Sequence, residues 1–161
     1  MPTTGNLAAT IALLLAFCST SQQARADCED VLARHMVGEA LLAAHLVAQA
    51  EKAGMQPAQI NTILQNISKE SSDEEFWITD SSGYAYLTNT GVDFTFSPDP
   101  NKQPQASEFW PLITGQKKIV IQRARKREID DRVFKYVGVA GVDKPRIVQV
   151  GLGEESLANC K

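Results

Sequence analysis

The densest group of chemically versatile side chains is a basic run from Lys117 to Arg127, with six cations in 11 residues. In a strand, Arg123, Arg125 and Arg127 would share one face. A guanidinium can hold a carboxylate through two parallel hydrogen bonds, so an arginine that turns inward would favour an anionic ligand. The alternative is a solvated edge strand whose charges prevent pairing with other chains. We assign Arg123 and Arg125 as candidate ligand-binding residues.

Three aromatic residues that carry polar atoms, Tyr86, Trp110 and Tyr136, are further candidates for binding a ligand. Buried OH and NH groups need partners, and a small molecule is one source of them. Core packing is the alternative, because large aromatic side chains dominate protein interiors. Gly138 and its small neighbours near Tyr136 either open space for a ligand or only allow a helix to pack closely.

Catalytic motifs do not accompany these residues: the sequence has no GxSxG elbow, HExxH helix, phosphate loop or CxxC pair. On a helix, His35 and His45 would lie about 80° apart around the axis and roughly 15 Å apart along it, too far to share a metal ion. The carboxylates of 73–75 and 130–131 fall in expected connectors, where solvated turns are the ordinary explanation. We therefore predict no enzyme activity, no metal and no cofactor, with a hydrolase built from dispersed residues as an alternative.

The N-terminus has the pattern of an export signal. Residues 7–17, LAATIALLLAF, are apolar, and Ala24-Arg25-Ala26 is the small-x-small sequence that signal peptidase cleaves after. Such a short run cannot cross a bilayer core of about 30 Å as a helix. We predict a signal peptide over 1–26 and a single domain over 27–161, periplasmic or secreted, without a membrane span after cleavage.

The net charge and the cysteine content further limit the functions that the protein could have. Removing Arg25 with the signal peptide takes the net charge from −3 to −4, which argues against nucleic acid as a partner. Cleavage also leaves Cys28 and Cys160, near the two ends of the mature chain, and in an exported protein we expect them to form a disulfide. Lipidation of Cys18 is an alternative, although Phe17 is large where a lipoprotein signal has a small residue.

The spacing of apolar residues predicts two helices followed by strands. The first helix is expected over 29–53, capped by Asp27 and ended by Gly54, and a second runs from Pro57 to about residue 69. From residue 75 onward, the spacing of apolar residues predicts five strands and a brief helix. The strands are expected over 75–80, 84–89, 117–128, 133–142 and 146–152, and the helix over 108–114. Runs of strands after runs of helices indicate an α+β fold.

The chain resembles the Cache family of extracytoplasmic, PAS-like sensory domains, in its single-module form. The resemblance rests on the hairpin EFWITDSSGYAYLTN, on DFTFSPDP followed by FWPLITG, and on FKYVGVAGVDKPRIVQVG. It covers roughly 29–153. It implies a five-stranded antiparallel sheet with a long N-terminal helix.

The resemblance also implies non-covalent binding of a small molecule, with small carboxylates as the leading class and amines not excluded. Cache domains usually lie between membrane helices and precede a cytoplasmic signalling domain, whereas this sequence stops eight residues after Gly153. We therefore expect a secreted sensor without an output domain, which signals through a membrane receptor or sensor kinase in signal transduction such as chemotaxis. The alternative is an interaction module whose pocket is filled by its own side chains, with a partner protein docking on the first helix.

Protein purified from an oxidising compartment should lack residues 1–26 and contain no free thiol, because Cys28 and Cys160 are expected to be paired. Intact-mass analysis with and without reduction checks both points. Two alkylatable cysteines in the unreduced protein would contradict the disulfide.

Overall fold

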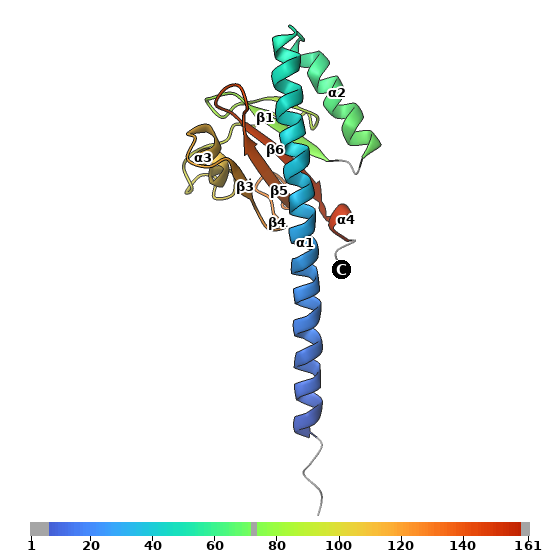
Figure 1. The fold of residues 1–161 in the computed structure, drawn as a ribbon. Helices are drawn as coiled ribbons and strands as arrows, with labels where there is room; N and C mark the ends of the chain where they lie inside the picture. Colours follow the sequence, from blue (N-terminus) through green and yellow to red (C-terminus); the bar gives the residue numbers. More distant parts are fainter. Residues whose placement is uncertain (1–6, 72–73, 159–161) are drawn as a thin grey trace, which may run out of the picture.

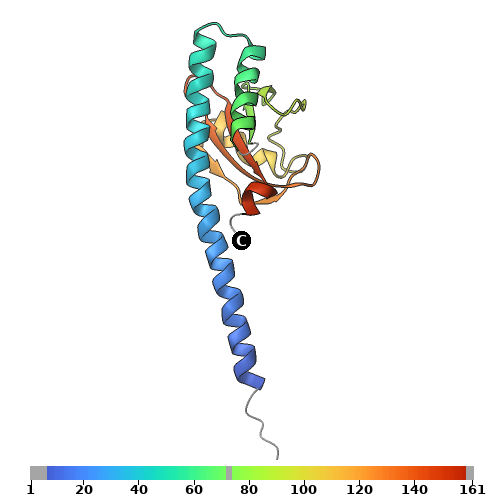
Figure 2. The same cartoon turned by 90° about the vertical axis from the view of Figure 1, so that its right-hand side faces the viewer.

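A computed structural model describes residues 7–71 and 74–158 of the chain. A long helix crosses one face of an antiparallel sheet, and short helices and a long loop cover the other face (Figure 1). Figure 2, turned by 90°, shows the sheet between these two layers. The predicted α+β class with a long N-terminal helix is therefore confirmed.

The first helix, α1, spans Leu7–Lys52 and is longer than predicted. Its N-terminal part extends beyond the sheet (Figure 1). The helix runs without a break through Asp27, so the prediction that Asp27 caps its start is wrong. Its end is as predicted: Gly54 adopts a left-handed φ of 79°, and the Met55 amide donates to the Ala50 carbonyl at 3.0 Å.

Export and the disulfide remain predictions. Among the described residues, one helical stretch, Ala26–Lys52, is long and apolar enough to cross a membrane, but part of it is buried inside the domain. Core helices and signal sequences share this property. Cys28 lies in α1, whereas Cys160 lies outside the described residues.

The second helix, α2 (Pro57–Glu70), begins at a proline in its first turn as predicted. It leads to the expected hairpin of β1 (Glu75–Thr79) and β2 (Ala85–Thr88). Gly83 has a φ of 88° in the turn between them. A Cβ at Gly83 would lie 2.5 Å from the Phe96 carbonyl oxygen, so glycine is required there for both conformation and space.

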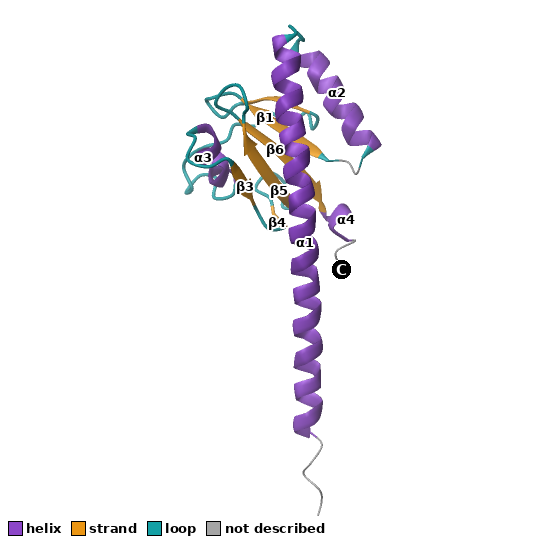
Figure 3. Ribbon diagram, viewed as in Figure 1, coloured by secondary structure: helices purple, strands orange, loops and turns teal. Residues whose placement is uncertain are grey.

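The polar loop after β2 leads to a 3₁₀ turn, η1 (Ala106–Phe109), and a short helix, α3 (Trp110–Ile113). These elements lie on the sheet face opposite α1, and Figure 3 distinguishes them from the strands by colour. The brief predicted helix is therefore present, although its first part has 3₁₀ geometry.

The predicted third strand is broken into β3 (Ile119–Ile121) and β4 (Arg125–Lys126). Both pair with the same edge of β5 (Val133–Ala140), so the described sheet has six strands where five were expected. Because the strand is interrupted, the arginine side chains do not lie on one face: Arg123 and Arg125 are exposed, whereas Arg127 is buried. The prediction that these three arginines share one face is therefore wrong.

The last strand, β6 (Ile147–Gly153), completes the sheet and is followed by the short helix α4 (Glu154–Leu157). The strand order is β2-β1-β6-β5-β3, and every pairing is antiparallel. The terminal hairpin of β5 and β6 thus forms the centre of the sheet, which explains its almost uninterrupted apolar sequence.

Two apolar cores lie on opposite faces of the sheet. One joins α1 and α2 to side chains such as Val137, Val148 and Val150. The other lies under η1, α3 and the preceding loop, and it is aromatic; its members include Trp77, Phe96, Phe109, Phe134 and Tyr136.

Gly138 shows which role the small residues of β5 have. A Cβ at this position would lie 2.6 Å from Cδ1 of Phe109, so the Phe109 ring fills the space above the strand. Of the two roles considered for Gly138, the structure supports close packing of a helical segment.

Gly138→Ala should lower the free energy of unfolding by about 1–3 kcal/mol, because the added methyl group overpacks the core against Phe109. Gly38→Ala is the matched control. Gly38 is helical and exposed, and a Cβ at this position would have no neighbouring atom within 4 Å, so alanine should raise stability by about 0.5–1 kcal/mol. Urea denaturation measures both effects, and equal responses of the two variants would contradict this account of the β5 surface.

Candidate functional site

The most distinctive polar group is Arg127, whose side chain is only 5% exposed. It follows β4 and points under the aromatic layer, where its guanidinium carbon lies 4.1 Å from the centre of the Phe134 ring. A buried charge is costly unless it is paired and hydrogen-bonded. The surroundings of Arg127 meet that requirement fully.

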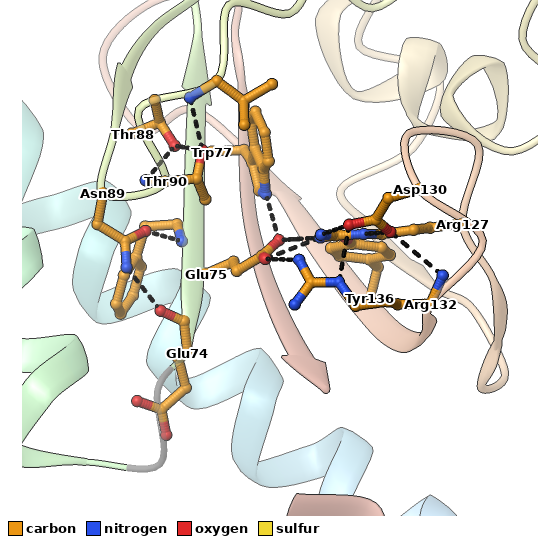
Figure 4. A network of polar contacts seen from close by, with 12 residues as sticks. Glu74, Glu75, Trp77, Thr88, Asn89, Thr90, Arg127, Asp130, Arg132 and Tyr136 are labelled. Atoms are coloured by element: carbon orange, nitrogen blue, oxygen red, sulfur yellow. Dashed lines mark hydrogen bonds and ion pairs between the residues drawn. The ribbon is translucent and has the colours of Figure 1, made fainter. Parts of the chain in front are cut away.

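Two carboxylates hold Arg127 from different sides (Figure 4). Nε and Nη2 donate side-on to the two oxygens of Asp130, each at 2.5 Å. Nη1 donates to the two oxygens of Glu75 at 2.8 and 2.6 Å, and to the Tyr136 hydroxyl at 3.1 Å. The hydrogen bond from Arg127 holds the pKa of Asp130 well below its usual range, so this carboxylate is ionised at neutral pH.

Glu75 anchors the network in the sheet. At the start of β1, it also accepts hydrogen bonds from Trp77 Nε1 at 3.3 Å and from the Tyr136 hydroxyl at 3.2 Å. The prediction that the carboxylates near 73–75 form a solvated turn is wrong for Glu74 and Glu75, which are buried and half-buried. Asp73 lies outside the described residues.

A small cavity of about 30 Å³ lies beside Arg127, between the sheet and the loop that precedes η1. It has room for roughly two waters, since one water needs about 10–15 Å³. The wall combines aromatic and polar side chains. The lining residues are Trp77, Phe94, Phe96, Gln105, Ala106, Phe109, Arg127, Glu128, Ile129, Tyr136 and Gln149.

Two glutamine side chains give the cavity wall unused hydrogen-bonding capacity. Gln105 and Gln149 are both more than nine-tenths buried. The Gln105 Nε2 atom has no partner among the described residues. None of the hydrogen bonds found among the described residues involves the Gln149 side chain. Buried amides are normally paired, so these two groups mark a place where a polar molecule would be held.

A second buried arginine network lies on the opposite face of the sheet. Arg146 donates to Asp143 at 2.5 and 2.7 Å, to Glu51 at 3.0 Å and to the Tyr86 hydroxyl at 2.6 Å. The Tyr86 hydroxyl in turn donates to Glu51. Although burial opposes it, hydrogen bonds from Lys144, Tyr86 and Arg146 lower the pKa of Glu51 to about 2. This network fastens the end of α1 to the turn between β5 and β6.

The structure does not bring the five predicted binding residues together. Tyr136 lines the cavity, but Tyr86 packs against the α1 core, so the two tyrosines lie on opposite faces. These two candidate binding residues therefore cannot contact the same ligand. Trp110 packs against the β1–β2 turn, where its Cζ3 would lie 2.8 Å from a Cβ at Gly83.

The predicted arginines also lie away from the cavity. Arg123 is exposed, and Arg125 forms an exposed ion pair with Glu108 at 2.7 Å. The break between β3 and β4 turns Arg127 inward instead. Sequence reasoning thus placed an inward arginine in the correct run but chose the wrong members.

Other predicted features are readily placed. His35 and His45 are both exposed on α1. Asp130 lies in the expected turn, but its carboxylate is engaged by Arg127 and Arg132. No cluster of three or more metal-ligating His, Cys, Asp or Glu side chains occurs among the described residues.

No protein-family model matches this sequence. A search among curated proteins finds no significant match either.

A larger hollow of about 740 Å³ lies on the other side of the Arg127 network, between the β4–β5 turn and α4. Its wall carries both signs of charge, including Lys126, Arg132, Glu154 and Glu155. Because no buried amide without a partner is found among its described lining residues, it is the weaker candidate for a specific ligand.

Arg127→Met should lower the free energy of unfolding by about 3–5 kcal/mol, because it leaves Glu75 half-buried without its cation while keeping most of the packing of the arginine stem. Arg125→Met is the control. Its partner Glu108 is exposed, so the loss should stay under about 1 kcal/mol. Guanidinium denaturation with fitted slopes compares the two variants. A loss below about 1 kcal/mol for Arg127→Met would show that the network does not stabilise the fold.

Proposed function

We propose that this protein is an exported sensory domain of the Cache type, which binds a small molecule non-covalently in the cavity beside Arg127. The observation that carries the proposal is the side-chain nitrogen Nε2 of Gln105, which is buried without a partner among the described residues, in a cavity wall that Gln149 also lines. An aromatic enclosure with a few convergent polar groups is the usual form of a small-molecule site. The long helix packed on the opposite face of an antiparallel sheet is consistent with a Cache domain.

A small carboxylate is the ligand class that we propose. Arg127 is a permanent cation in the cavity wall, and its planar donors suit a carboxylate. The aromatic rings of the wall would cover an apolar body of a few atoms. A ligand larger than roughly two waters requires part of the cavity wall to move outward.

Binding without catalysis is part of the same proposal. The cavity wall contains no Ser, Cys or His side chain among the described residues, and its carboxylate, Glu128, is exposed. Burial and the nearby Glu75 carboxylate raise the pKa of Tyr136, so its phenol is a poor base at neutral pH. The bound state would be read by a separate membrane receptor or sensor kinase.

A protein-interaction module is the second candidate function. The small size of the cavity favours it, as do exposed apolar residues on α1, namely Val31, Leu41 and Leu42. In this alternative the aromatic layer is only a core, and a partner protein binds the outer face of α1.

A thermal-shift screen against a metabolite library separates the two candidates. A ligand present at 100 times its dissociation constant should add about 2.7 kcal/mol of stability. Calorimetry on a compound found in this way should show at least tenfold weaker binding to Gln149→Leu, which keeps the size of the side chain but cannot form hydrogen bonds. Gln49→Leu, an exposed change on α1, is the matched control and should bind normally. A complete screen without a stabilising compound would favour the interaction module.

A further inference from the structure

The turn between β4 and β5 has two roles at the candidate site. Residues 128–131 are exposed. The Arg127 amide donates to the Arg132 carbonyl at 2.9 Å, which closes the turn. From this turn Glu128 and Ile129 form part of the cavity wall, while Asp130 binds the Arg127 guanidinium. One short surface segment therefore both closes the cavity and occupies its cation.

The Arg127 guanidinium has no spare charge to offer a third carboxylate. Asp130 takes the side-on position at Nε and Nη2, and Glu75 takes Nη1. Carboxylates crowded around one guanidinium repel one another, and this repulsion is only partly screened by the protein and the solvent. An incoming carboxylate must therefore replace one of the two that are already there.

Asp130 is the more replaceable partner. Its side chain is 34% exposed, compared with 13% for Glu75. On leaving Arg127, the Asp130 carboxylate can be solvated at once, close to Arg132, which already donates to it at 2.7 Å. Glu75 would have to leave β1 and break its hydrogen bonds with Trp77 and Tyr136.

The turn also has a conformational reason to move. Asp131 has a φ of 60° and is the only described residue other than glycine with a positive φ. A left-handed conformation at such a residue is locally unfavourable, although aspartate tolerates it better than most. The contacts of Asp130 and the hydrogen bond from the Gln105 backbone N–H to the Glu128 carboxylate hold the turn in this form.

We propose that Asp130 occupies the position that the carboxylate of a ligand takes on Arg127. Displacement of Asp130 would move Glu128 and Ile129 away from the cavity and make room for the rest of the ligand. The cavity of about 30 Å³ would then be the closed form of the site. This inference rests on the proposed binding function and adds to it a built-in competitor that sets the affinity.

Two variants that each remove one negative charge from the turn test the proposal. Asp130→Asn loses a bidentate acceptor of Arg127, whereas Asp131→Asn leaves Arg127 untouched and keeps a residue that tolerates positive φ. The probes are acetate, propionate and benzoate, with propionamide as the uncharged analogue, titrated by calorimetry into the purified protein. We expect Asp130→Asn to bind at least one carboxylate ten or more times more tightly than the unchanged protein does. Asp131→Asn should stay within twofold of the unchanged protein.

Equal affinities in the two variants would overturn the proposal, as would carboxylate binding that weakens in Asp130→Asn. Absence of carboxylate binding in all three proteins would overturn it as well. The broader binding function would survive these results if the metabolite screen found an uncharged ligand sensitive to Gln149→Leu. Tighter binding of propionamide together with propionate would overturn competition for the cation and show a general opening of the cavity.

A spectroscopic measurement on the unchanged protein gives an independent test. The Arg127 Nε–H proton donates to Asp130, so exchange of one carboxylate for another should shift its resonance on titration with sodium propionate. Sodium chloride at the same ionic strength should not. Broadening or shifts confined to surface arginines would contradict exchange at Arg127, whatever the stability of the substituted proteins.

Discussion

Burial of the Arg127 charge is the constraint on which this side of the molecule depends. A guanidinium inside an aromatic layer must be neutralised and hydrogen-bonded, and the chain supplies one carboxylate from β1 and one from the turn before β5. These two acids are far apart in sequence, so the pairing fixes the start of β1 against the β4–β5 turn. The stacked rings of Phe134 and Tyr136 then complete the enclosure, with Arg127 over the first and hydrogen-bonded to the second.

A buried arginine paired with two carboxylates is found on each face of the sheet. Arg146 is buried on the α1 side and joins Glu51 of α1 to Asp143 of the β5–β6 turn. In both networks an arginine binds one acid three residues away and one distant acid, so each ties a turn to a remote element. The difference lies in what is nearby: Arg127 borders a cavity with unpaired amides, and Arg146 does not line that cavity.

Much of the fold could be predicted because the signals are local. The Gly54 helix end, the Pro57 helix start and the hairpin turn at Gly83 follow from residues that favour those backbone conformations. The site could not be predicted as well, because it depends on the break between β3 and β4. An ideal strand places Arg123, Arg125 and Arg127 alike, and only the interrupted strand separates them. A usable signal was present in Gln149, a polar residue in the apolar strand IVQVG, where burial without a protein partner indicates a special environment.

The use of charge in the β4–β5 turn is informative because charge is an inefficient means of holding a turn. Replacing a buried ion pair by well-packed apolar side chains is often neutral or stabilising, and the aromatic layer around Arg127 already offers such packing. A hydrophobic turn would fasten the same segment without the cost of desolvating three ions. An ion pair, unlike an apolar contact, can be replaced by a small soluble ligand. A carboxylate from outside can accept hydrogen bonds from the same donors in the same geometry, whereas an apolar contact has no small soluble equivalent. Because the ion pair that holds the turn lies at the wall of a cavity, we regard the turn as part of a binding site.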